Sequence, residues 1–140
     1  MNKPKLNLIV CVGKDNLIGD KVPVGNGLLW HSMEELQYYK SKTVGNVVLF
    51  GENTAKYVPL NLMKKYEDSG KNIFVCGGYT IYKYYLDNYE LDEIYISKLK
   101  PHVEVAEAQN PLYFPDVEKY GYKLVSETEY NDFTACVYKK

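Results

Sequence analysis

The chain has 140 residues, of which 46% are hydrophobic and 25% charged, and its formal net charge is −1. This composition is typical of a soluble folded protein and excludes a largely disordered chain. The balanced charge indicates neither nucleic acid nor an acidic membrane as a partner. The length predicts one domain, residues 1–140, with a hydrophobic core of its own.

The apolar run near the N-terminus is too short to span a membrane and lacks the cleavage site of a signal peptide, so we expect a cytoplasmic protein. Cys11, Cys76 and Cys136 each lie in an apolar run without metal-ligand spacing, which indicates reduced core residues and no metal site. All 17 basic residues are lysines, so an anion would be held by lysine, backbone N–H groups or hydroxyls instead of a guanidinium.

Short apolar runs alternate with helical patterns along most of the chain. In the first half of the chain we expect a buried strand at 6–12, a loop at 13–29, a helix from the cap Ser32 to about residue 42, a strand at 47–50 and a short helix that begins near Asn53 and is bounded by Pro59. In the second half we expect a helix at 61–68, a strand at 73–76, a helix from Thr80 to about Leu86, and strands at 93–97, 122–125 and 134–138. The last two strands are expected to form a hairpin through 130–132. This order predicts an α/β fold whose sheet is mostly parallel with an antiparallel C-terminal edge.

Two glycine turns stand where ligands collect in such sheets, beyond the carboxyl ends of the strands. Gly77 and Gly78 follow the third buried strand and open a helix, where close backbone approach and a helix N-terminus favour an anion such as a pyrophosphate. Gly51 similarly precedes Asn53 and Thr54, whose side chains could bind phosphate oxygens. Each turn alone is better explained by a tight strand-to-helix connection, with Asn53 or Thr54 as the N-cap.

The start of the first helix carries an acid with two explanations. Ser32 and Glu35 have the spacing of a capping box, in which each side chain binds a free backbone N–H. Alternatively, the Glu35 carboxylate is poorly solvated, and a flat heterocycle with an amidine-like edge would satisfy it through two charge-assisted hydrogen bonds. Its neighbours on that side are Trp30, Leu36 and Tyr39. The adjacent Glu34 is expected to face solvent.

In this order, the motifs resemble the dihydrofolate reductase family over nearly the whole chain. The matching segments are residues 9–19, Trp30 with Glu35, Leu36, Tyr39 and Lys40, 47–54 without Glu52, 75–78 with Ile81 and Tyr82, Tyr95–Ser97 and 114–116. The resemblance implies a single domain of that family's fold, a twisted sheet with helices on both faces. Only a short segment separates Gly51 from Ile73, which implies that one edge of the sheet is truncated.

The resemblance implies hydride transfer from NADPH to 7,8-dihydrofolate, giving tetrahydrofolate for one-carbon and thymidylate metabolism. Three catalytic residues follow from it. Glu35 would bind the pterin edge and favour protonation of N5, Ser97 would help to hold that edge, and Trp30 would position a water.

The resemblance also implies two sets of binding residues for a small-molecule substrate and its cofactor. The substrate pocket would be formed by Ile9, Val10, Leu28, Glu35, Leu36, Tyr39, Val58 and Ser97. The cofactor would contact Cys11, Ile18, Gly51, Asn53, Thr54, Gly77, Gly78, Tyr79 and Tyr82. We expect no metal, no nucleic acid or membrane partner, and a monomer.

Departures from the family pattern affect the cofactor side. Glu52 stands where an arginine often faces the 2′-phosphate, and a carboxylate there would repel that phosphate but could accept a bond from a free 2′-hydroxyl, so NADH is a second possible cofactor. Tyr79 replaces the third glycine of the family's triplet. These departures leave open a protein of the same fold that is weak or inactive in catalysis and acts as a binding or assembly module. A related pyrimidine reductase of riboflavin synthesis is a third reading, although the spacing of Trp30 and Glu35 favours the folate enzyme.

Overall fold

The sheet at the centre of the molecule is built around its first strand. The computed structural model describes residues 3–21, 29–50 and 59–140. Within them a six-stranded sheet has the order β3 (Val47–Phe50), β4 (Ile73–Gly77), β1 (Leu6–Val12), β5 (Glu93–Leu99), β8 (Phe133–Lys139) and β7 (Lys123–Glu129). Strands β3, β4, β1 and β5 are parallel, whereas β8 and β7 run antiparallel to their neighbours. The predicted mixed sheet is therefore confirmed.

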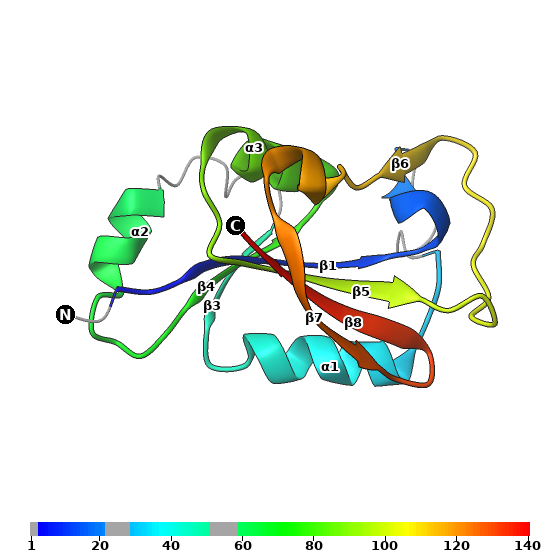
Figure 1. Ribbon diagram of the computed structural model, residues 1–140, viewed down its shortest axis with the longest axis horizontal. Coiled ribbons are helices and arrows are strands. Elements are labelled where there is room, and N and C mark those ends of the chain that lie inside the picture. Colours follow the sequence, from blue (N-terminus) through cyan, green and yellow to red (C-terminus); the bar gives the residue numbers. More distant parts are fainter. Residues whose placement is uncertain (1–2, 22–28, 51–58) are drawn as a thin grey trace.

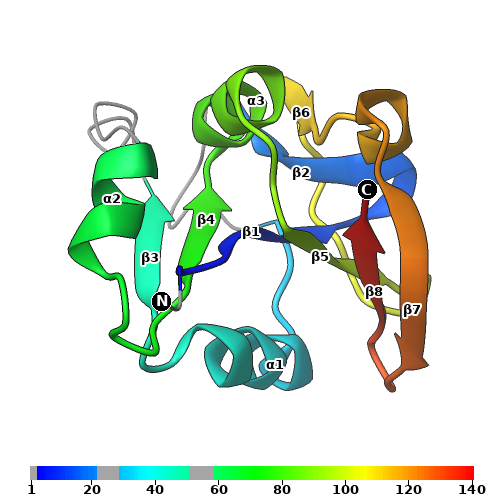
Figure 2. The same cartoon turned by 60° about the vertical axis from the view of Figure 1, so that its left-hand side comes forward.

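Helices cover both faces of the sheet, as expected (Figure 1). Helix α1 (Met33–Thr43) lies on one face, and α2 (Pro59–Lys65) and α3 (Tyr79–Asn88) lie on the other (Figure 2). Side chains of β1 are buried on both faces of the strand, which explains its nearly continuous apolar sequence. The core on the α3 side collects Leu8 and Val10 of β1 with Ile81, Tyr85 and Leu86 of the helix.

Helix α1 begins and ends at residues that its sequence explains. Ser32 is the N-cap, because its hydroxyl accepts a hydrogen bond from the Glu35 N–H at 3.2 Å. The helix ends before Gly45, which has φ of +76°, a backbone conformation that glycine adopts without strain. The serine half of the predicted capping box is thus present, and the Glu35 side chain faces elsewhere.

A small second sheet corrects the predicted loop at 13–29. Residues Leu17–Asp20 form β2, which pairs antiparallel with β6 (Pro111–Tyr113), and the short 3-10 helix η1 (Lys14–Asn16) precedes it. The pair lies beside the end of β1 (Figure 1). Local sequence could not show this strand, because its partner is more than ninety residues away in the chain.

Two other boundaries differ from the prediction. Strand β7 runs over Lys123–Glu129, past the predicted end at residue 125, and its residues are exposed, so the charged half of the strand lacks an apolar pattern. Helix α2 spans Pro59–Lys65, with proline in the first turn, where a missing N–H costs nothing. The short helix expected near Asn53 lies outside the described residues.

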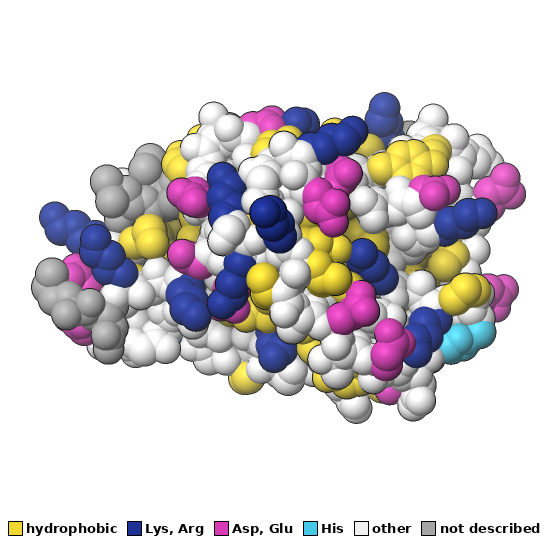
Figure 3. All heavy atoms as spheres, viewed as in Figure 1, with side chains coloured by type: hydrophobic (Ala, Val, Ile, Leu, Met, Phe, Trp, Pro, Cys, Tyr) yellow, Lys and Arg dark blue, Asp and Glu magenta, His cyan; other side chains and the backbone are white. Residues whose placement is uncertain are grey.

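The surface carries both signs of charge. Figure 3 shows lysine and acidic side chains interspersed over one face, consistent with the net charge of −1. None of the helices in the described part of the chain is both long and apolar enough to cross a membrane.

We predict that Leu8→Ala lowers the free energy of unfolding by about 2–5 kcal/mol, because the side chain is 0% exposed in the centre of the sheet and its loss leaves a cavity. The matched control is Leu124→Ala on the edge strand β7, where leucine is 43% exposed. Urea denaturation of both variants checks this. Equal losses in the two variants would contradict the assignment of the core.

Candidate active site

A cleft opens at the carboxyl ends of β1 and β4, where open α/β sheets place their ligand sites. Its volume is about 790 Å³. The described residues that line it are Ile9, Val10, Cys11, Ile18, Gly19, Trp30, His31, Ser32, Glu35, Leu36, Tyr39, Phe50, Cys76, Gly77, Gly78, Tyr79, Tyr82 and Leu112. Side chains from the sheet, from the first turns of α1 and from the start of α3 therefore meet in one hollow.

Glu35 is the acid of this cleft. It lies in the first turn of α1, and its side chain is half-buried among the apolar walls. Burial raises the pKa of the Glu35 carboxyl above its ordinary value, and the nearby Ser97 hydroxyl opposes that rise by interacting with the charged form. The carboxyl is thereby shifted towards holding its proton nearer neutral pH.

Ser97 lies behind the cleft instead of on its wall. It stands on β5 next to Cys11 of β1 in the strand register, and it is 0% exposed. Its hydroxyl makes no hydrogen bond of ordinary geometry with the described residues, although it is near enough to influence Glu35. A buried hydroxyl with spare hydrogen-bonding capacity beside a carboxyl is suited to a ligand or a water that completes the set.

Burial holds three other ionisable side chains of the cleft, Cys11, Tyr39 and Tyr82, in their neutral forms. Burial, with a smaller contribution from the Glu35 charge, raises the pKa of the Cys11 thiol, and burial likewise raises the pKa of the Tyr39 hydroxyl. The Tyr82 hydroxyl donates a hydrogen bond to the Ile9 carbonyl at 2.8 Å, and burial raises its pKa as well. Among these groups, Glu35 is the one placed to exchange a proton with a ligand.

Trp30 lies at the edge of the cleft, in the segment leading into α1. Its ring passes close to Gly13, where an added Cβ would lie 3.6 Å from the indole. The Trp30 side chain also interacts with the Cys11 thiol. The indole therefore lies against the end of β1, in the cleft that Glu35 also lines.

The paired glycines form the turn from β4 into α3. Gly77 has φ of +118°, and a Cβ there would lie 3.1 Å from the Tyr82 hydroxyl oxygen, so only glycine fits. The Gly77–Gly78 peptide bond is cis. Gly78 is the N-cap residue of α3 and lines the cleft, and among the described residues no atom lies within 4 Å of where its Cβ would be.

The structure brings together most of the residues selected from the sequence. All of those that it describes line the cleft, with the exception of Ser97 behind it: Ile9, Val10, Cys11, Ile18, Trp30, Glu35, Leu36, Tyr39, Gly77, Gly78, Tyr79 and Tyr82. The remainder lie outside the described residues: Leu28, Gly51, Glu52, Asn53, Thr54 and Val58. In the described parts of the chain, no group of side chains could hold a metal ion.

Two expectations about single residues were wrong. Cys11 and Cys76 are free thiols on the wall of the cleft instead of core residues, since the strand ends that carry them open into the hollow; Cys136 is buried as predicted. Glu34 does not simply face solvent, because its carboxylate accepts a hydrogen bond from the Asp132 N–H at 2.7 Å. That contact joins residues far apart in the chain and has no local signal.

Sequence reasoning also missed several lining residues. These are Gly19, His31, Ser32, Phe50, Cys76 and Leu112. Three of them, His31, Ser32 and Cys76, adjoin motifs that the sequence did identify. Their place next to those motifs could therefore have indicated that they line the cleft. Leu112 reaches the cleft only through the pairing of β6 with β2, which the sequence does not indicate.

The arrangement of strands and helices is similar to that of a known enzyme. The solved structure of Schistosoma mansoni dihydrofolate reductase matches with a TM-score of 0.64 and 21% sequence identity, over 99% of this chain and 99% of that one. The chain has a dihydrofolate reductase-like fold. Compared by sequence alone, no protein-family model and no curated protein matches it.

We predict that Glu35→Gln raises the free energy of unfolding at about pH 8 but has a much smaller effect near pH 4. The native carboxyl keeps its proton to higher pH than the unfolded one, so the native state binds more protons in that interval. Stability is consequently lost as pH rises from the ordinary pKa of glutamate through the raised pKa of Glu35, and glutamine removes that loss.

Urea denaturation at the two pH values measures this difference. Glu90→Gln, at an exposed position after α3, is the control and should change neither value. A Glu35→Gln variant that is no more stable than the wild type at the higher pH would show that the carboxylate is well solvated.

Proposed function

We propose that this protein reduces 7,8-dihydrofolate to tetrahydrofolate with hydride from NADPH, NADH being the second possible donor. The observation that carries the proposal is the half-buried Glu35 carboxyl, which lines the same cleft as the paired-glycine turn. The dihydrofolate reductase-like fold supports it. At 21% identity, that likeness by itself indicates only the fold.

The acid and its surroundings fit the edge of a pterin ring. A carboxylate can accept two parallel hydrogen bonds from the adjacent amide and amino groups of such a ring, and partial burial strengthens them. The Ser97 hydroxyl behind Glu35 would accept or donate a further bond, directly or through a water. The flat apolar faces of the ring would lie among Ile9, Leu36 and Tyr39.

Glu35 would also manage the proton that this reduction consumes. Its raised pKa keeps a share of the carboxyl protonated nearer neutral pH than an exposed glutamate would be, so the residue would favour the ligand protonated at N5. Trp30 would hold a water at the mouth of the site and limit the access of others. Val10 would complete the wall beside Ile9.

The paired-glycine turn has the properties that a dinucleotide needs. Gly78 stands at the N-terminus of the ten-residue helix α3, and no atom of the described segments fills the space beside its Cα, so a pyrophosphate could approach the backbone N–H groups closely. A bound reduced nicotinamide would supply the hydride. Its neighbours in the cleft would be Cys11, Ile18, Gly77, Tyr79 and Tyr82. Of the residues outside the described segments, Gly51, Asn53 and Thr54 belong to the same cofactor proposal, and Leu28 and Val58 to the proposed substrate pocket.

We expect purified wild-type protein to oxidise NADPH or NADH in the presence of dihydrofolate, and Glu35→Gln to lower kcat/KM by about 10²–10⁴-fold, because glutamine can neither bind the ring edge as an anion nor release a proton. The fall in absorbance of the reduced nicotinamide measures the rate. Running both nicotinamides in parallel gives the cofactor preference.

The control for that assay is Glu90→Gln, an exposed acid outside the cleft, which should retain full activity. A folded wild type that is silent with both nicotinamides would contradict the proposal and favour a binding module of the same fold. If the wild type instead reduces an aminopyrimidine of riboflavin synthesis, Glu35 would act in that reduction and the dihydrofolate proposal would be wrong.

We predict that Gly78→Ala folds with wild-type stability but weakens binding of NADPH by about tenfold. Its φ of −87° is negative, as in most residues other than glycine, and a Cβ would meet no atom of the described residues within 4 Å, so the methyl group would occupy space that the ligand needs. The single tryptophan, Trp30, lies in the cleft, and quenching of its fluorescence reports binding. Unchanged affinity would place the dinucleotide elsewhere.

A further inference from the structure

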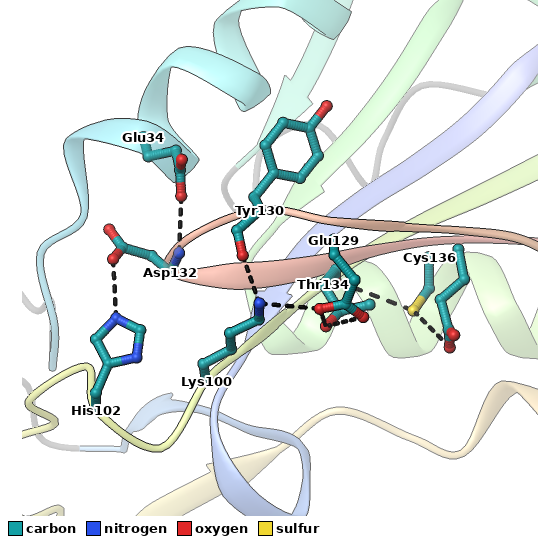
Figure 4. A network of polar contacts seen from close by, with 9 residues as sticks. Glu34, Lys100, His102, Glu129, Tyr130, Asp132, Thr134 and Cys136 are labelled. Carbon is teal, nitrogen blue, oxygen red and sulfur yellow. Dashed lines mark hydrogen bonds and ion pairs between the residues drawn. The ribbon is translucent and has the colours of Figure 1, made fainter.

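Asp132 connects three segments of the chain at the outer side of the cleft. It stands in the turn between β7 and β8, and Figure 4 shows its side chain and backbone between the start of α1 and the chain that follows β5. It does not line the cleft itself. Its side chain is about 30% exposed, so the contacts described below are partly shielded from water.

Every polar group of Asp132 has a partner. Carboxylate oxygen Oδ2 accepts a hydrogen bond from the Ser32 hydroxyl at 2.5 Å, and Oδ1 lies 3.1 Å from Nε2 of His102. The Asp132 N–H donates to Glu34 at 2.7 Å, and its carbonyl accepts from the Lys100 N–H at 2.8 Å. The hydrogen bond from Ser32, followed by that of His102, lowers the pKa of the Asp132 carboxyl, which therefore remains charged.

Two of these contacts bear directly on the acid of the cleft. The Ser32 hydroxyl has one hydrogen, and because this hydrogen goes to Asp132, the oxygen lone pairs remain available for the Glu35 N–H. The Glu34 side chain is held at the same time, and Glu34 is the residue directly before Glu35. The backbone of Glu35 is thus fixed at its own N–H and at its preceding neighbour.

We propose that Asp132 is a positioning residue for Glu35: it fixes the first turn of α1 from outside the cleft by orienting the Ser32 hydroxyl and holding Glu34. The hairpin itself does not need this side chain. Its turn is closed by the Tyr130 N–H bound to the Phe133 carbonyl at 2.9 Å, and the two rings stack with centroids 4.6 Å apart. The Asp132 carboxylate is directed instead at Ser32 and His102.

The test reads Glu35 without requiring turnover. Asp132→Ala is expected to speed hydrogen exchange of the Glu35 amide about fivefold, the loss typical of a weakened N-cap, with no change at amides of β1. The pKa of the Glu35 carboxyl, followed by carbon NMR, should move down towards its ordinary value as water reaches the loosened turn. Asp132→Asn keeps an oxygen acceptor for Ser32 and should restore most of both properties.

Two further variants distinguish positioning from general stability. Ser32→Ala should speed exchange of the Glu35 amide at least as much as Asp132→Ala, because it removes the capping hydroxyl itself. The double variant should be no worse than Ser32→Ala alone, because Asp132 acts on Glu35 through that hydroxyl. Asp116→Ala is the matched control, since this aspartate caps the 3-10 helix η3 (Val117–Tyr120) through the Glu118 N–H at 3.0 Å. It should leave Glu35 unchanged.

The positioning role of Asp132 matters for catalysis only if the proposed function holds, and the two proposals can fail separately. Any of three results would overturn the positioning role. In Asp132→Ala, the hydrogen exchange and the pKa of Glu35 could equal those of the wild type, or the amides of β1 could exchange faster by the same factor as the Glu35 amide. In the double variant, the two effects could be additive. A wild type without dihydrofolate reduction would contradict only the proposed function. If the enzyme is active, Asp132→Ala should lower kcat more than it raises KM, because the acid is displaced while the apolar walls remain.

Discussion

The parallel register of three neighbouring strands is the constraint on which the rest of the structure depends. Leu8 of β1 pairs with Val75 of β4 on one side and with Ile94 of β5 on the other. Because the three strands point the same way, their carboxyl ends open at one edge of the sheet, and the chain there must turn into helices or loops. Apolar side chains fix this register, since a shift by one residue would move each buried side chain to the opposite face.

The acid depends on that edge and on its own helix. A carboxyl group that is partly removed from water is destabilised as an anion unless a hydrogen-bond donor compensates it. In the described structure, the Ser97 hydroxyl interacts favourably with the charged form of Glu35. The helix contributes position instead: its capped first turn faces the ends of the strands. The energetic cost of partly burying the Glu35 carboxylate is thus tolerated because the surrounding fold holds the residue in place. Such costs are common at catalytic sites.

Much of this arrangement follows from local sequence, and the remainder does not for a physical reason. The buried strands are recognisable because apolar residues are nearly continuous in them, and Glu35 because it sits beside a capping serine and apolar neighbours. The β2–β6 pair and the contact of Glu34 with Asp132 join segments that are about a hundred residues apart, so no window of sequence contains both partners. The sequence does not show that Cys76 lies on the cleft wall, because a strand that ends at a cleft has the same composition as one that does not.

The close approach of Gly77 to Tyr82 has a consequence for how this chain can vary. The phenol occupies the space that any side chain at position 77 would need, and its hydroxyl is already committed to the Ile9 carbonyl. A side chain at 77 would be strained by the positive φ as well as crowded by the phenol. A smaller residue at 82 would relieve only the crowding, and it would leave the strand carbonyl without its donor. Change is therefore disfavoured at both positions, at 77 by the backbone conformation and the neighbouring ring, and at 82 by the hydrogen bond to the Ile9 carbonyl.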